Sequence, residues 1–131
     1  MPDVLRESPS GPPFTGQLGG SCPSHSPFVD LDILAGAVEI DLSDASVFRL
    51  ILDANVTTVT MANVTTGEAN FFTLEIAQDA VGSRTFAPPA SWKYSTGAYA
   101  PSSAANAVDL LNGISFDNGV TWLVSYLRNY I

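Results

Sequence analysis

From Val29 onward the chain alternates apolar and polar residues with a period of two, which is the pattern of a strand that buries one face. In the segment AVEIDL, residues 37–42, aliphatic side chains alternate with two carboxylates. The segments 46–53 and 70–78 repeat this alternation, and 55–63 is rich in the β-branched residues that fit a pleated surface. The pattern therefore predicts a strand at each of these places.

The stretch GISFDNGVTWLVSYL, residues 113–127, predicts two further strands joined by a hairpin. Asn118 and Gly119 follow Asp117, and both residue types accept the positive φ that tight hairpin turns require. Trp122 lies in the second of these strands. Six or seven short strands separated by turns predict an all-β fold, a small antiparallel β-sandwich or barrel.

One segment, SSAANAVDLL at residues 102–111, leaves helix and strand open as alternatives. Ser102 or Ser103 could cap a turn of helix before Asp109. Elsewhere in the chain helical patterning is nearly absent, so the all-β prediction does not depend on this segment.

The N-terminal residues differ in composition from the rest. Six of the nine prolines fall within residues 1–27, mixed with glycine and serine. We therefore divide the chain into a Pro/Gly/Ser-rich arm, 1–29, and a β-domain, 30–131. Composition alone favours a disordered tail for such a segment. Our interpretation is an extended arm that lies on a partner or on a neighbouring subunit.

Composition and charge narrow the classes of function. Hydrophobic residues make up 46% of the 131 residues and charged residues 14%, against about 25% charged in an average soluble domain. Some apolar surface is therefore expected to be hidden against copies of the chain or a partner. The net charge of −8 argues against binding nucleic acid and against docking on an anionic membrane. No run reaches the roughly 18 apolar residues of a membrane-spanning helix.

The stretch QDAVGSR, residues 78–84, gathers Gln78, Asp79 and Arg84 around Gly82. A catalytic acid or base needs a partner within hydrogen-bond reach and a means of tuning its pKa. The alternative is structural, because a loop aspartate commonly accepts hydrogen bonds from turn amides and can pair with an arginine across the loop. We interpret these four residues as a turn and as part of a seam between subunits, and we predict no enzymatic activity.

The chain contains few of the histidine and cysteine residues that commonly bind metals or act as nucleophiles. His25 is the only histidine and Cys22 the only cysteine, and both lie in the arm. A metal site generally needs three or four ligands, so we predict no metal and no cofactor. Calcium bound by carboxylate oxygens stays open as an alternative, because five acidic residues fall within fifteen positions: Asp30, Asp32, Glu39, Asp41 and Asp44.

The irregular stretch PPASWKYSTGAYAP, residues 88–101, carries Trp92, Tyr94 and Tyr99. When such rings are exposed together, they can stack on sugars or become buried at an interface. These three are our candidate contact aromatics, and packing in the core or between subunits is the alternative.

Several of these segments form an ordered series between about Asn55 and Leu127. A strand runs into Gln-Asp-Ala-x-Gly-x-Arg-Thr and then into a proline and a tryptophan. A segment with a further proline leads to Ala-Asn-Ala-x-Asp, and a hairpin leads to a closing tryptophan. In this order the segments resemble a C-terminal β-domain that recurs in virion proteins of tailed bacteriophages. The matching positions are Gln78, Asp79, Ala80, Gly82, Arg84, Thr85, Pro88 or Pro89, Trp92, Pro101, Ala105, Asn106, Ala107, Asp109, Asp117, Gly119 and Trp122.

The resemblance implies a trimeric β-domain located in the virion, of the tail-fibre, head-fibre or capsid-decoration type. The expected function is that of a structural accessory component, which the arm 1–29 anchors to another capsid or tail protein. The alternative is a carbohydrate-binding module of a tail fibre, in which the contact aromatics meet a host glycan.

Overall fold

The computed structural model describes residues 24–130. Most of the predicted arm, 1–29, therefore lies outside the described residues, as does Cys22. The described part consists of eight strands and connections and contains no helix, so the all-β prediction is confirmed and no helix in this part could cross a membrane. The strands are β1 (Phe28–Leu31), β2 (Ala37–Asp41), β3 (Val47–Leu52), β4 (Thr58–Ala62), β5 (Asn70–Gln78), β6 (Trp92–Lys93), β7 (Val108–Ser115) and β8 (Trp122–Tyr130).

The strands form a six-stranded sheet in the order β1-β3-β5-β7-β8-β6 and a two-stranded sheet of β2 and β4. The prediction of antiparallel pairing is wrong for much of the fold. β1 with β3, β3 with β5, β2 with β4, and β6 with β8 pair parallel, and only β5 with β7 and β7 with β8 pair antiparallel. The larger sheet is therefore mixed.

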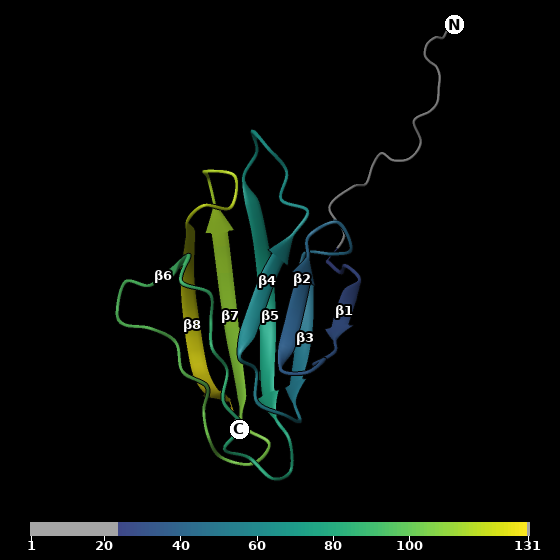
Figure 1. The fold of residues 1–131 in the computed structure, drawn as a ribbon, viewed down its shortest axis with the longest axis vertical. Helices are drawn as coiled ribbons and strands as arrows, with labels where there is room; N and C mark the ends of the chain where they lie inside the picture. The colour runs from purple at the N-terminus through teal and green to yellow at the C-terminus, as the bar shows by residue number, and fades with distance from the viewer. Residues whose placement is uncertain (1–23, 131) are drawn as a thin grey trace, which may run out of the picture.

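The parallel pairs follow from the path of the chain. From β1 to β5 the chain alternates between the two sheets, so each return to the larger sheet enters it in the same direction. β2 and β4 run parallel for the same reason. Figure 1 shows β2 and β4 lying over β3 and β5, so the small sheet covers half of one face of the larger sheet. We call this covered side the inner face and the opposite side the outer face.

The core lies between the inner face and the small sheet. Phe48, Leu50 and Leu74 are fully buried on the inner face, and Val38 and Ile40 of β2 close over that face. Burying each large apolar side chain contributes about 1.5–3 kcal/mol relative to leaving it in water. The alternation in the sequence thus marks the side of each strand that faces this core.

The other half of the inner face is covered by residues 79–107, the long connection between β5 and β7. Phe86 and Tyr99 of this connection pack edge to face, with ring centroids 6.1 Å apart. Trp92 stacks on Phe72 of β5 at 5.1 Å, and the fully buried Trp122 of β8 lies 5.5 Å from the same ring. A segment with little regular structure therefore completes the core.

Two boundaries differ from the sequence-based division. β1 begins at Phe28, so Phe28 and Val29 belong to the sheet and not to the arm. The helix left open at 102–111 is not formed, and β7 begins at Val108. The reason is visible at Ser102, whose hydroxyl donates to the carboxylate of Asp109 instead of capping a helix.

Candidate functional site

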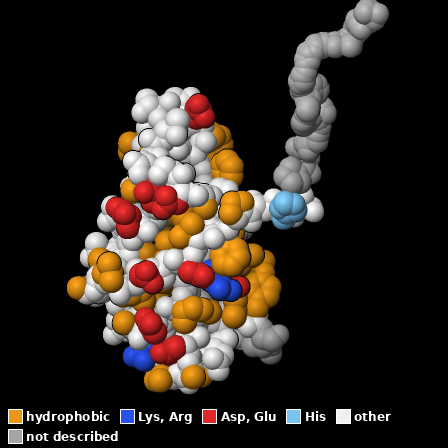
Figure 2. Space-filling view, turned by 90° about the vertical axis from the view of Figure 1, so that its right-hand side faces the viewer, with side chains coloured by type: hydrophobic (Ala, Val, Ile, Leu, Met, Phe, Trp, Pro, Cys, Tyr) orange, Lys and Arg blue, Asp and Glu red, His pale blue; other side chains and the backbone are white. Residues whose placement is uncertain are grey.

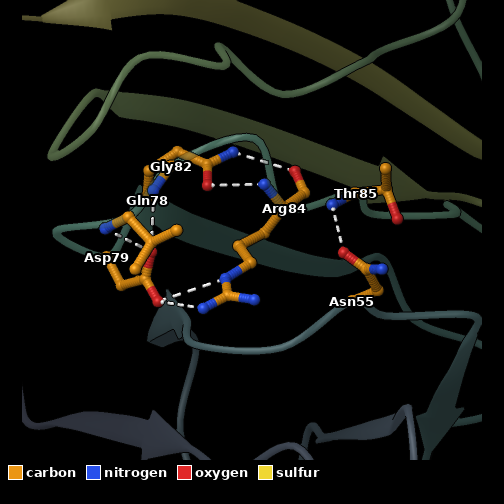
Figure 3. Close-up of polar contacts among 7 residues, drawn as sticks. Asn55, Gln78, Asp79, Gly82, Arg84 and Thr85 are labelled. Carbon is orange, nitrogen blue, oxygen red and sulfur yellow. Dashed lines mark hydrogen bonds and ion pairs between the residues drawn. The ribbon is translucent and has the colours of Figure 1, made fainter.

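The turn that follows β5 is built around the side-chain amide of Gln78 (Figure 3). Gln78 is the last residue of β5 and is buried. Its Nε2 donates to the carbonyl oxygens of Arg84 and Ser102, both at 2.9 Å, and its Oε1 accepts the backbone N–H of Arg84 at 3.0 Å. The amide therefore satisfies backbone groups of a segment that has left the sheet.

Asp79 holds the same turn from its own side chain. Its Oδ1 accepts the backbone N–H groups of Val81 and Gly82 at 3.0 and 2.9 Å. Its Oδ2 accepts two N–H groups of the Arg84 guanidinium at 3.1 and 2.9 Å. The hydrogen bond from Arg84, followed by that from Gly82, lowers the pKa of the Asp79 carboxyl below its ordinary value. The carboxylate is thus kept ionised and occupied by donors.

Gly82 brings this turn against the segment 103–105. Its φ is +78°, and a Cβ at this position would lie 2.8 Å from both the nitrogen of Ala105 and the carbonyl oxygen of Ser103. Ser83 donates its N–H to the carbonyl oxygen of Ser103 at 2.8 Å. On the other side Asn55 accepts the N–H of Thr85 at 3.0 Å, which ties the end of the turn to the β3–β4 connection (Figure 3).

The structure thus brings Gln78, Asp79, Gly82 and Arg84 together in one closed turn. Every polar side chain among them has a partner within the chain: the amide bonds backbone groups and the carboxylate pairs with the guanidinium. Such an arrangement can fix a backbone conformation, but it presents no carboxylate free to accept a proton from a substrate. The seam between subunits, the second half of our interpretation of these residues, stays a prediction.

Asp109 is the centre of a second polar network, and sequence reasoning did not single it out as a site. The side chain points to the inner face and is 1% exposed. Its Oδ2 accepts the hydroxyl of Tyr99 at 2.7 Å and the N–H of Ser102 at 2.8 Å, and its Oδ1 accepts the hydroxyl of Ser102 at 2.6 Å and the N–H of Asn129 at 2.8 Å. One carboxylate therefore joins β7, β8 and the long connection.

The ionisation of this network follows from its partners. Burial raises the pKa of Asp109, but the hydrogen bonds from Ser102, Tyr99 and Asn129 outweigh burial and leave the pKa below its ordinary value. Burial, together with the hydrogen bond to Asp109, raises the pKa of the Tyr99 hydroxyl. The ionised carboxylate of Asp109 therefore accepts a hydrogen bond from the protonated hydroxyl of Tyr99, and this arrangement is a stable structural one.

Two of the three candidate contact aromatics are buried, which favours the alternative that these rings pack in the core. Trp92 and Tyr99 are each 3% exposed, and only Tyr94 is half-buried. Tyr94 and Tyr99 both pack edge to face on Tyr126, at 5.8 and 5.2 Å between ring centroids. The rings are internal because the 79–107 connection, although irregular, covers half of the inner face.

The hairpin residues lie between β7 and β8. Asn118 and Gly119 have φ values of +60° and +82°. Asp117 Oδ1 accepts the N–H of Thr121 at 2.8 Å and the hydroxyl of Ser115 at 2.9 Å. Trp122 follows as the first residue of β8 and is fully buried. These residues form a turn that positions two antiparallel strands.

The acidic cluster is spread over several elements. Within residues 24–130 no three His, Cys, Asp or Glu side chains lie close enough to hold a metal ion. Asp30 pairs with Arg49 at 2.8 Å. The Asp41 carboxylate accepts the hydroxyl of Ser43 and the side-chain amide of Asn63, and these bonds lower its pKa. His25, the only histidine, is exposed.

The outer face of the six-stranded sheet is a feature that sequence reasoning did not locate. The strand register places Asp30, Arg49, Glu75, Leu110 and Leu127 in one row across five strands, on the side away from β2 and β4. Large hydrophobic side chains are exposed on this side of the strands: Phe28, Ile51, Phe71, Leu123 and Leu127. The low content of charged residues indicated that the protein has exposed apolar surface, but it did not indicate on which part of the fold that surface lies.

Figure 2 looks at the molecule from the β1 edge. Adjoining hydrophobic side chains gather on the right of this view, which is the side of the outer face, and acidic groups recur on the left. Three shallow depressions open on the outer face or at its border: one of about 250 Å³ beside Phe28 and Leu110, one of about 460 Å³ beside Lys93 and Leu123, and one of about 470 Å³ beside Arg49 and Asp53. None is an enclosed pocket of the kind that holds a small substrate.

Comparisons with protein-family models, with curated proteins and with solved structures gave no match.

Proposed function

We propose that this chain is a structural component of a bacteriophage virion, which acts by assembly and not by catalysis. In this proposal the β-domain associates as a homotrimer, and the part of the arm that precedes β1 anchors it to another capsid or tail protein. The role is that of a small accessory component, either a capsid decoration or head-spike protein or a tail-fibre or tail adaptor protein.

The observation that carries the assembly part is the exposed apolar outer face. Phe71, Leu123 and Leu127 are each more than half exposed although they lie within the strands of a sheet. Single exposed apolar residues are ordinary, but several of them gathered on one face of a sheet are typical of an interaction surface. The polar networks at Asp79 and Asp109 support the same function, because their side chains bond the protein's own turns and strands.

The phage part rests on the ordered series of residues from Gln78 to Trp122. Members of that series contact one another across the fold. Gly82 lies against Ala105, and Asn106 donates its N–H to the carbonyl oxygen of Asp79 at 3.0 Å. The series therefore behaves as one structural unit in which the turn docks on a later segment, which is what a recurrent domain requires.

The glycan-binding alternative receives less support. A sugar platform needs aromatic faces open to solvent. Trp92 and Tyr99 are buried, so within residues 24–130 the predicted trio does not offer such a platform. The buried rings therefore favour assembly over glycan binding.

The proposal is tested by mass and by location. The full chain should sediment as a particle of three times its 13.8 kDa. Mass spectrometry of purified particles of the phage that encodes the chain should detect it at several copies per particle. A monomer would contradict the homotrimer, and absence from particles despite synthesis in infected cells would contradict the virion role.

A further inference from the structure

We infer that the outer face of the six-stranded sheet is the surface through which copies of this chain contact one another. This inference rests on the association proposed above and adds the surface that performs it. It commits to a second copy of the chain as the occupant of the face, for reasons of bonding, charge and area.

Four polar side chains of the face, Asp30, Arg49, Thr73 and Asn112, already have partners within the chain. Asp30 and Arg49 form an ion pair at 2.8 Å, and the guanidinium of Arg49 also lies over the ring of Phe28, 5.0 Å from its centroid. Thr73 donates its hydroxyl to Asn112 Oδ1 at 2.8 Å. Covering a polar group is costly chiefly when it loses its hydrogen bonds. These groups can be covered by another surface and keep them.

The charge of the face favours a copy of the same chain. Within the strands the outward-facing charged residues are Asp30 and Glu75 against Arg49 and Lys93, which sum to zero. The acidic excess begins at the border of the face, where Asp32 and Asp53 line a depression together with Arg49 and Ile51, and the rest of the net charge of −8 lies elsewhere on the chain. Two copies repel each other through every acidic surface, so they associate most easily through the one that carries no net charge. A basic partner would instead prefer the acidic surfaces.

The area of the face is adequate for a specific contact. The five strands β1, β3, β5, β7 and β8 contain 4, 6, 9, 8 and 9 residues. At a rise of about 3.3 Å per residue and a strand spacing of about 4.8 Å they span roughly 570 Å² before side-chain relief is counted. Two such faces together bury roughly 1,100 Å², which is close to the lower end of the range for specific protein interfaces. Additional copies around a symmetry axis would add to this area.

The closing experiment compares two variants of the full chain by sedimentation over a dilution series. Leu127→Glu places a carboxylate at a position that is 65% exposed on the outer face. If copies meet there, each copy contributes a buried, unpaired charge, and the dissociation constant should rise by about 100-fold. Val81→Glu is the comparison variant: Val81 is 73% exposed on the 78–84 turn, where the sequence predicts a seam between subunits and this inference places none. It should leave the dissociation constant within about twofold.

Each outcome decides the inference. An oligomer that withstands Leu127→Glu but dissociates in Val81→Glu would place the contact at the turn, which overturns the inference and leaves the proposed assembly intact. A monomeric unchanged chain would overturn both, since neither the face nor any other surface would then join copies of the chain. If Leu127→Glu fails to fold, as judged by circular dichroism, Ser125→Arg repeats the test at an exposed polar position of the same strand face. An association that persists in folded Ser125→Arg would equally contradict the inference.

Discussion

At the scale of single residues, Asp109 stabilises the core through hydrogen bonds, whereas most other core positions do so through packed apolar side chains. A buried carboxylate is expensive unless donors surround it. Here Tyr99, Ser102 and Asn129 supply four hydrogen bonds, which fix the C-terminal end of the 79–107 connection against β7 and β8. The network therefore stabilises one arrangement of three segments that the apolar pattern alone would leave less well defined.

Asp109→Asn should lower the free energy of unfolding at pH 7 by about 3 kcal/mol, because an amide removes the charge and replaces one acceptor oxygen with a donor. The pKa of Asp109 is depressed in the folded state, so its contribution is present above the unfolded pKa of about 3.9 and is lost as pH falls through the folded pKa. Urea denaturation at pH 7 and pH 3, at one protein concentration, should show the difference between the two proteins shrinking at the lower pH.

The control for this substitution is Asp44→Asn, at an exposed position in the β2–β3 connection. It should change stability by no more than about 0.5 kcal/mol. A loss at Asp109 that stayed equally large at pH 3 would show that the amide acts by steric misfit and not through the charge.

At the scale of elements, the turn after β5 shows how a short sequence controls docking. Gln78 and Asp79 bond the backbone of residues 81–84, and this places Gly82 in contact with the segment before β7. Positive φ alone would permit other residues at moderate cost. The close approach to Ser103 and Ala105 is what demands a residue without a Cβ.

Gly82→Ala should therefore destabilise the fold by about 3 kcal/mol, the sum of backbone strain and displacement of the 103–105 segment. Gly67→Ala separates the two causes, because Gly67 has a φ of +82° and nothing within 4 Å of a Cβ. It should cost only about 1 kcal/mol. Thermal or urea unfolding of both variants measures the difference. Equal losses would mean that the close approach at Gly82 relaxes without cost.

Strand positions were predictable from the sequence because burial of one face imposes a period of two. The segments around β2, β3, β4, β5 and β8 carry that signal. Pairing direction was not predictable, because the alternation within β3 and β5 is the same whether the two strands run parallel or antiparallel. The parallel order results from the excursion through β4, which only the whole path defines.

Among the candidate sites, too, some could be located from the sequence and others could not. The Gln78–Arg84 turn could be located because its residue types are those of a local, hydrogen-bonded turn. Asp109 could not, because β7 carries apolar residues on both faces and nothing in the pattern marks an inward acid. The burial of Trp92 and Tyr99 was also hidden, since an irregular connection shows no period even where it forms core.

At the scale of the whole molecule, the acidic excess lies outside the strands of the outer face. The outer face combines exposed hydrophobic side chains with two balanced pairs of charges, and the acidic excess lies on the remaining surface and at the rim, where Asp32 and Asp53 follow the ends of β1 and β3. Two copies of such a molecule attract each other through the apolar residues of the outer face, and they repel each other through the acidic groups of the rim and the remaining surface. The balance between the two should therefore depend on ionic strength.

Raising sodium chloride from 0.01 M to 0.1 M shortens the Debye length from about 30 Å to about 10 Å, which screens repulsion between copies but leaves apolar contact in place. The dissociation constant should fall several-fold over this range, as measured by sedimentation of the full chain. Asp53→Asn, which removes one rim charge from each copy, should tighten association at 0.01 M and have little effect at 0.1 M. If added salt instead weakened association, attractive ion pairs would have to cross the interface, and a neutral apolar contact would no longer explain the assembly.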